Sequence, residues 1–139
     1  MEKMVDLFTY GSLMFSPIWE RVVAGSYTAL PAVLKGYTRM SVLNEDYPVI
    51  IPLESGLCNG VLYKNVSEKD LILIDLFEGK EYKRATATVS LSHLDKPITV
   101  NAEIYKLNPD YSSIVGTTIW DKESFEKNKI QKFIQKYNL

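Results

Sequence analysis

The stretch DLFTYGSLMF, residues 6–15, joins an apolar strand pattern to a glycine turn. Residues 5–10 predict a strand, and where a strand turns through glycine toward a helix, successive backbone N–H groups can receive a carboxylate or an oxyanion. Tyr10 would then wall a pocket, Gly11 would allow close approach of a ligand, and Ser12 would add a hydroxyl. The same residues also suit a strand-to-helix turn that serves the backbone alone.

The composition narrows the classes of function. The chain has 139 residues, of which 46% are hydrophobic and 24% charged, with a formal net charge of −1. This predicts a single domain over residues 1–139 and gives no basic excess for nucleic acid. Cys58 and His93 are the only cysteine and histidine, so an intrachain disulfide and a Cys/His metal cluster are both excluded. No stretch approaches the roughly 18 apolar residues of a membrane-spanning helix, and we expect a soluble, cytoplasmic protein.

Short apolar runs separated by turn residues predict several strands. The first helix is expected between Ser16-Pro17 and Gly25. Further strands are expected at 27–35, 37–43, 48–52 and 57–64, and a hairpin pairs 82–91 with 98–107 around a turn at 93–97 that contains His93. Within 82–91, polar and small apolar residues alternate, which predicts one solvated and one packed face. This regular succession of short strands indicates a small barrel or a strongly bent sheet.

A second helix is expected over residues 68–77. A capping-box pattern at residues 67–70 opens it, and Gly79 is a natural C-cap. Because residues 71–74, 76 and 77 are all large and apolar, we expect this helix to be buried all round. At about 100° per residue, Glu78 lies close to the direction of Leu71.

Glu78 is the candidate acid or base. Burial and the negative end of the helix dipole both disfavour its charged form, so we expect a raised pKa, which suits proton transfer near neutrality. The alternative is that Glu78 points to water from a frayed last turn. Asp75 is expected to be structural and paired with Arg84 or Lys83.

The C-terminal stretch, residues 121–139, places apolar side chains on one helical stripe, namely Ile130, Phe133, Ile134 and Tyr137. Its lysines are those at 127, 129, 132 and 136. A solvated face on a helix that docks on the core is favoured over a membrane-binding face, because the segment also carries acids. Trp19 and Trp120 are interpreted as packing anchors, although the indole of Trp120 would also suit the rim of a pocket.

Four blocks of sequence, in order along the chain, carry a resemblance to a known family. They are Tyr10-Gly11-Ser12-Leu13, NGVLY at 59–63, LIDLFEGKEYKR at 73–84 and IWDKESF at 119–125. These blocks resemble the signature of the gamma-glutamylcyclotransferase-like family, which also takes in plant avirulence-induced proteins. The most specific match is the pattern Leu-Asp-x-x-Glu-Gly-x-x-Tyr-x-Arg, here with isoleucine at position 74.

The resemblance implies an α+β fold, a small mixed β-barrel flanked by a few helices. It implies an enzyme that cyclises a small-molecule γ-glutamyl substrate to 5-oxoproline without metal or cofactor and releases an amine. Glu78 would be the catalytic acid/base. The substrate would be held by Tyr10, Gly11, Ser12 and Leu13, and by Tyr82, which would bind substrate or orient Glu78.

Several questions stay open at the level of sequence. A non-catalytic small-molecule binding or regulatory module of the same fold is the main alternative, since fold does not determine function. A hydrolase that uses Cys58 or Ser12 as nucleophile is a weaker one. The leaving amine is undetermined, a homodimer is open, and residues 44–56 would form either a wall or a lid of the pocket.

Overall fold

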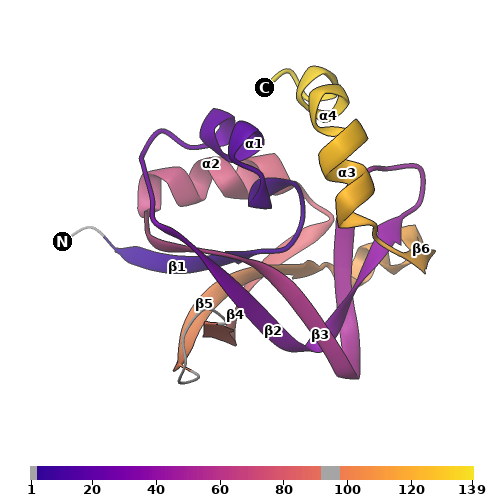
Figure 1. Cartoon of the computed structure of the whole chain (residues 1–139), viewed down its shortest axis with the longest axis horizontal. Helices are drawn as coiled ribbons and strands as arrows, with labels where there is room; N and C mark the ends of the chain where they lie inside the picture. The colour runs from indigo at the N-terminus through magenta and orange to yellow at the C-terminus, as the bar shows by residue number, and fades with distance from the viewer. Residues whose placement is uncertain (1–2, 92–97) are drawn as a thin grey trace.

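The computed structural model describes residues 3–91 and 98–139, and a mixed six-stranded sheet organises it (Figure 1). The strands are β1 Met4–Thr9, β2 Ala29–Val42, β3 Pro48–Ser67, β4 Tyr82–Leu91, β5 Ile98–Leu107 and β6 Val115–Ile119. The helices are α1 Ser16–Val22, α2 Glu68–Glu78, α3 Lys122–Asn128 and α4 Ile130–Lys136, with 3-10 turns η1 Ser12–Met14 and η2 Pro109–Ile114. The predicted turn at 93–97, with His93, lies outside the described residues.

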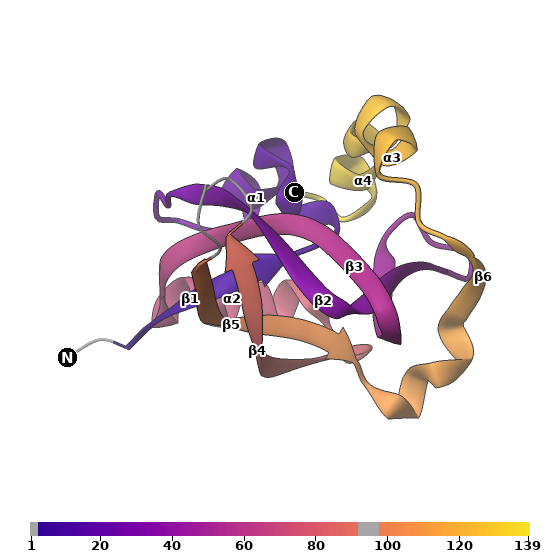
Figure 2. The same ribbon diagram turned by 60° about the horizontal axis from the view of Figure 1, so that its bottom comes forward.

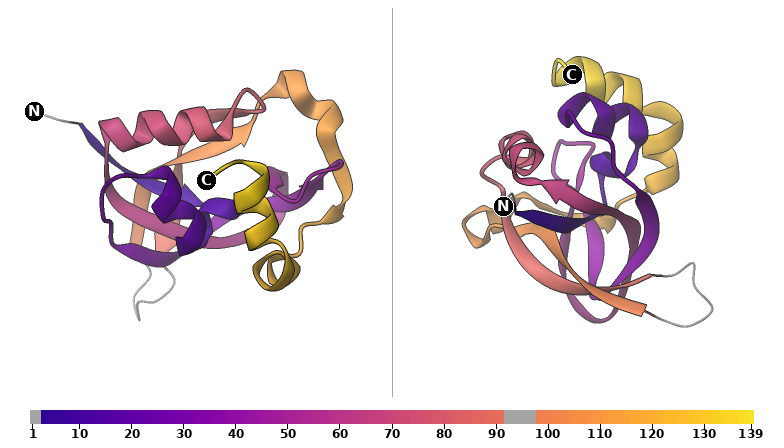
Figure 3. Two further views of the ribbon diagram at one scale, coloured as in Figure 1. Left: turned by 90° about the horizontal axis from the view of Figure 1, so that it is seen from above. Right: turned by 90° about the vertical axis from the view of Figure 1, so that its left-hand side faces the viewer.

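Five of the strands close into a ring. The strand order is β3-β1-β5-β4-β2-β6, and β2 also pairs with β3, so β6 alone stands outside the ring on β2 (Figure 2). All pairs are antiparallel except β1 with β5. The predicted α+β class is confirmed, and the expected barrel takes the form of this five-stranded ring with helices gathered beside it (Figure 3).

Strands β2 and β3 are each continuous where the sequence predicted two shorter strands. The expected break at Gly36 is a bend, with a φ of +87° that favours glycine. Lys35 faces Leu57 while Tyr37 faces Pro52, so β3 carries extra residues opposite this bend. A Cβ on Gly56 would lie 2.4 Å from the Tyr37 carbonyl oxygen, which explains the glycine there. The predicted turns are therefore bulges within long strands.

The capping pattern of α2 is confirmed. The Ser67 hydroxyl accepts from the Asp70 N–H at 3.2 Å, and Gly79, with φ +82°, donates its N–H to the Asp75 carbonyl at 3.2 Å. The Asp70 carboxylate accepts from the Ala24 and Gly25 N–H groups, both at 2.9 Å. Burial opposes the charge on Asp70, but these bonds hold its pKa below the usual value. Asp70 thereby ties α2 to the segment that follows α1.

The core is divided between the two faces of β1. Leu7 and Phe8 are consecutive residues and both are fully buried, because alternate side chains of a strand point to opposite faces. Phe8 packs inside the ring with Leu62 and Ile104, and Leu7 belongs to the cluster beneath the helices. The hairpin alternation is confirmed as well, since Val89 is buried while its polar neighbours face outward.

The expectation that α2 is buried all round is wrong. Leu71 and Ile74 pack on the core, but Ile72, Leu73 and Leu76 are 55%, 42% and 75% exposed. The helix lies on the outside of the molecule, so only one stripe of it reaches the sheet (Figure 1). Hydrophobicity around the whole circumference therefore did not indicate burial here.

The C-terminal stretch forms two short helices, α3 and α4, divided at Lys129, where the sequence suggested one. Phe125, Phe133 and Ile134 are buried in the cluster under the helices. Trp19 stacks on Tyr63 at 3.6 Å between ring centroids, as expected of a packing anchor. None of the helices described is both long enough and apolar enough to span a bilayer.

Gly60→Ala is expected to destabilise the fold. A Cβ at residue 60 would lie 2.2 Å from the Thr9 carbonyl oxygen, so β1 and β3 would have to separate, at a cost of about 1–3 kcal/mol or more. Ser55→Ala, at an exposed position of the same strand, is the matched control. Chemical denaturation measures both, and equal stability of the two variants would contradict the close approach of the strands.

Candidate active site

A cavity of about 190 Å³ opens where β1, α2, β3 and α4 meet. It is smaller than the roughly 300–1,000 Å³ typical of pockets for drug-sized ligands, which suits a ligand moiety of amino-acid size. Its walls come from distant parts of the chain, namely residues 8–13, 47–48, 77–79, 81–82, Tyr105, Phe133 and Tyr137. All six residues that the sequence proposed for the site, Tyr10, Gly11, Ser12, Leu13, Glu78 and Tyr82, line this one cavity.

The turn after β1 is fixed by its carbonyl groups. Arg39 Nη1 donates to the Tyr10 carbonyl at 3.1 Å, and the Tyr63 hydroxyl donates to the Leu13 carbonyl at 2.7 Å. The N–H groups of Gly11, Ser12 and Leu13 donate to no acceptor within residues 3–91 and 98–139. Three consecutive backbone N–H groups of residues that line the cavity are therefore unused, and hydrogen bonds to its carbonyl groups hold the turn in place.

Glu78 is the last residue of α2, and its side chain lies in the cavity. Burial raises the pKa of Glu78 to about 8, and the negative charges of Asp75 and Glu81 act in the same direction. No Lys or Arg in the described part of the chain forms an ion pair with Glu78. The pKa is thus shifted in the direction expected, and the carboxyl can give or take a proton near neutral pH.

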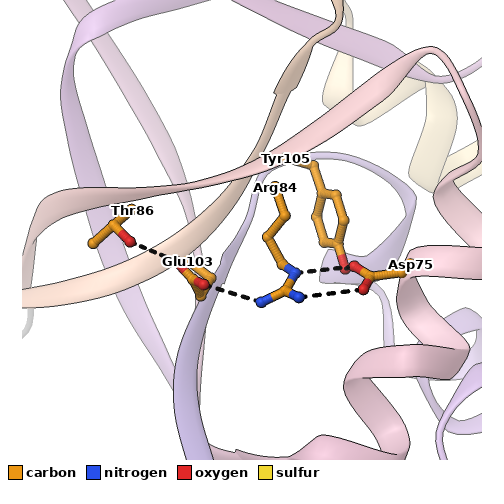
Figure 4. Close-up of polar contacts among 5 residues, drawn as sticks. All are labelled: Asp75, Arg84, Thr86, Glu103 and Tyr105. Atoms are coloured by element: carbon orange, nitrogen blue, oxygen red, sulfur yellow. Dashed lines mark hydrogen bonds and ion pairs between the residues drawn. The ribbon is translucent and has the colours of Figure 1, made fainter.

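The Asp75 carboxylate belongs to a polar network with Arg84, Thr86, Glu103 and Tyr105 (Figure 4). Arg84 bridges two acids, with Nε 3.1 Å from Asp75 Oδ1 and Nη1 3.0 Å from Glu103 Oε1. The Tyr105 hydroxyl donates to Asp75 Oδ1 at 2.6 Å, and the Thr86 hydroxyl donates to Glu103 at 2.8 Å. Asp75 is therefore paired with Arg84, one of the two structural partners expected, and its charge is held in place next to Glu78.

Two tyrosines connect this network to the cavity. Tyr105 lines the cavity, and its carbonyl accepts from the Tyr10 hydroxyl at 2.5 Å. Burial, followed by the charge of Glu78, keeps the pKa of Tyr10 well above its usual value, so Tyr10 is a neutral donor. Tyr105 thus makes two separate hydrogen bonds, one from Tyr10 to its backbone carbonyl and one from its side-chain hydroxyl to Asp75. The sequence reasoning missed Tyr105 and Glu103, which carry no signal beyond strand alternation.

Tyr82 lines the cavity, but its hydroxyl proton is already used. It donates to the Pro48 carbonyl at 2.6 Å, and burial raises its pKa well above the usual value. With this proton on Pro48, the Tyr82 hydroxyl has only its oxygen left to accept a hydrogen bond, and its role in binding substrate or orienting Glu78 stays a prediction. Tyr82 also joins β4 to the start of β3, so that Tyr47 and Pro48 form a wall of the cavity.

The other candidate residues lie elsewhere. Cys58 is buried within β3 outside the cavity lining, and burial raises the pKa of its thiol to about 11. Trp120 is also absent from the lining, and its indole N–H donates to the Asp46 carbonyl at 2.7 Å. Among the described residues, no group of three or more His, Cys, Asp or Glu is arranged to hold a metal ion.

The fold is that of the gamma-glutamylcyclotransferase-like proteins. A solution structure of an Arabidopsis thaliana protein matches with a TM-score of 0.72 and 28% identity over 98% of this chain and 81% of that one. The structure of a gamma-glutamyl cyclotransferase matches with a TM-score of 0.69 over 99% of this chain and 82% of that one, at 13% identity, which speaks for the fold alone.

The sequence comparisons identify the family. The profile of the family described as "Gamma-glutamyl cyclotransferase, AIG2-like" matches residues 7–126. Protein AIG2 C of Arabidopsis thaliana is 30% identical over 133 residues, which cover 95% of this chain and 78% of that protein. The chain therefore belongs to the AIG2-like gamma-glutamyl cyclotransferase family.

Glu78→Gln is expected to gain stability over wild type as the pH rises. Because the pKa of Glu78 is raised from 4.5 to about 8, folding favours the protonated carboxyl. Its contribution is fully present below about pH 4.5 and is lost as the pH rises through about 8. Glutamine resembles the protonated form at every pH, so the difference in unfolding free energy should shift by roughly 2–4 kcal/mol between about pH 5 and pH 9.

Urea denaturation at the two pH values measures this shift. Glu126→Gln removes an exposed carboxylate of α3 and is the control, with a difference from wild type that stays nearly constant. A pH-independent difference for Glu78→Gln as well would show that Glu78 has an ordinary pKa.

Proposed function

We propose that this protein is an enzyme that converts a γ-glutamyl amine or γ-glutamyl amino acid into 5-oxoproline and a free amine. One observation carries the proposal, namely that Glu78, with a pKa of about 8, shares a cavity with the unused N–H groups of Gly11, Ser12 and Leu13. A proton carrier and a set of anion-binding donors then face the same ligand. Membership of the family supports the same chemistry.

The γ-glutamyl group suits this cavity because its charges are complementary to the lining. The N–H groups of residues 11–13 bind the substrate carboxylate or the oxyanion that develops on the γ-carbonyl. The α-ammonium lies beside Glu78, where a buried carboxyl without a cationic partner gains one. Tyr10 and Tyr82 act as walls, because their hydroxyl protons are given to backbone carbonyls.

The reaction is an intramolecular aminolysis. Glu78 takes a proton from the α-ammonium, whose reference pKa is about 8, and the free amine attacks the γ-carbonyl carbon. The new carbon–nitrogen bond closes the ring, and the bond from that carbon to the leaving nitrogen breaks. Glu78 delivers the protons lost by the α-nitrogen to the leaving nitrogen, which departs as an ammonium ion. Since the reacting groups belong to one molecule, holding the folded conformer supplies much of the rate enhancement.

Glu78→Gln is expected to abolish most of the turnover. The amide keeps the size of the side chain but cannot carry the proton, and general acid–base catalysis contributes about 10²–10⁴-fold. The measurement is 5-oxoproline release from a panel of γ-glutamyl amines and γ-glutamyl amino acids, with wild type, Glu78→Gln and the Glu126→Gln control at equal concentrations. Release by wild type and Glu126→Gln, with a loss of at least about 100-fold in Glu78→Gln, is the expected result.

Two outcomes of the panel would contradict the proposal. Undiminished release by Glu78→Gln would remove Glu78 from the mechanism. Binding of panel compounds, seen as thermal stabilisation of folded wild type, without any 5-oxoproline would make the protein a binding module with this fold.

A further inference from the structure

The mouth of the cavity is built from four aromatic side chains, of which only Phe77 belongs to the sequence motif that contains Glu78. Tyr47 comes from the segment before β3, Phe77 from α2, and Phe133 and Tyr137 from α4 and the residue after it. Tyr137 is 37% exposed while Phe133 is buried, so this wall runs from the interior to the solvent. For a ligand whose γ-glutamyl end lies at residues 11–13, this wall offers a surface for the other substituent.

The wall is held in place by contacts between the C-terminal region and residues 45–46. Lys136 Nζ lies 2.8 Å from Glu45 Oε2, and the Tyr137 hydroxyl lies 3.1 Å from the same oxygen. Lys129 Nζ lies 3.3 Å from Asp46 Oδ1. The positive charge of Lys136 is therefore matched by Glu45. Lys136 does not line the cavity, although its Nζ lies 5.5 Å from the centroid of the Tyr137 ring, on which it makes a cation–π contact.

Two acidic residues line the cavity. They are Glu78 and Glu81, and within the described ranges no Lys or Arg lines it. Glu81 Oε2 lies 3.0 Å from the position that a Cβ on Gly79 would take, which places this carboxylate against the end of α2. Glu81 forms no ion pair with any residue of the described chain. Burial, Glu45 and, more weakly, Glu81 raise the pKa of Tyr137 to about 12, in agreement with a carboxylate that faces the aromatic wall.

We propose that this mouth is a subsite for the leaving group, and that it selects an amine whose aliphatic chain ends in a second cation over one that ends in a carboxylate. The proposal rests on the cyclotransferase function proposed above. The chain packs on Phe133, Phe77 and the edge of Tyr137, and the terminal cation lies between Glu81 and the ring of Tyr47. An aromatic face beside an acid attracts a cation, and a carboxylate there would meet Glu81, which has no paired base.

Three synthetic substrates with the same four methylenes test the selection. They are the N-γ-glutamyl derivatives of 1,4-diaminobutane, pentylamine and 5-aminopentanoate, which end in an ammonium, a methyl and a carboxylate. The measured quantity is kcat/KM for 5-oxoproline release. The expected order is ammonium, then methyl, then carboxylate, with at least about a tenfold ratio between the first and the last, as one favourable charge contact of about 1.4 kcal/mol gives.

Two variants test whether the substrate selectivity arises at the mouth of the cavity. Glu81→Gln is expected to reduce the ammonium-to-carboxylate ratio several-fold, and Tyr137→Ala is expected to lower kcat/KM for the ammonium and methyl compounds. Glu126→Gln, on the exposed face of α3, leaves the ratio unchanged. A ratio near one in wild type, or a ratio that survives Glu81→Gln, would overturn the proposal. So would a preference for the carboxylate compound that disappears in Lys136→Gln.

Failure of the cyclotransferase function gives a different result from failure of the subsite. If neither these three compounds nor any member of the panel described above yields 5-oxoproline, the proposed function fails, and the rank order is then read from thermal stabilisation of wild type by each of the three compounds. Stabilisation in the order ammonium, methyl, carboxylate would support the subsite in a binding protein. Equal stabilisation by all three would overturn it.

Discussion

The Glu78 carboxyl lies in a protein cavity without a cationic partner among the described residues, and this constraint governs the chemistry of the site. Such a group avoids its charged form, and the neighbouring acids Asp75 and Glu81 reinforce the effect. Near neutral pH the carboxyl is therefore mostly protonated, and a ligand that brings an ammonium group favours the ionised form. Substrate binding and the generation of the base are then one event.

The fold maintains this unfavourable placement through contacts on either side. The left-handed Gly79 ends α2 directly after Glu78, and Ser67 and Asp70 fix the other end of the helix. Arg84 forms an ion pair with Asp75, which keeps this carboxylate in place near Glu78. On the opposite wall, Arg39 and Tyr63 occupy the carbonyls of the turn after β1 and leave its N–H groups free. The stability of the ring of strands thus supports a site that would not be stable alone.

Local sequence predicted the parts of the site whose geometry is local. The glycine turn after β1, the two caps of α2 and the alternation of β4 each depend on a few consecutive residues, and all three are found in the structure. Contacts between distant segments were not predictable in this way. Tyr105, which links Tyr10 to Asp75, and Tyr137, which forms the mouth, reach the site only through the closure of the ring and the docking of α4. The burial of α2 was mispredicted for the same reason, because the apolar residues around the helix do not determine which elements pack against it.

The most direct test of this account is the pKa of Glu78 itself. Titration of carboxyl-labelled protein by carbon-13 NMR resolves it, with the signal assigned by its absence in Glu78→Gln. The account predicts a midpoint near 8 in the free protein, because burial and two neighbouring acids raise the pKa from the usual 4.5. It predicts a lower midpoint when an amine-bearing γ-glutamyl ligand is bound. A midpoint near 4.5 in the free protein would contradict it, because Glu78 would then be an ordinary solvated carboxylate.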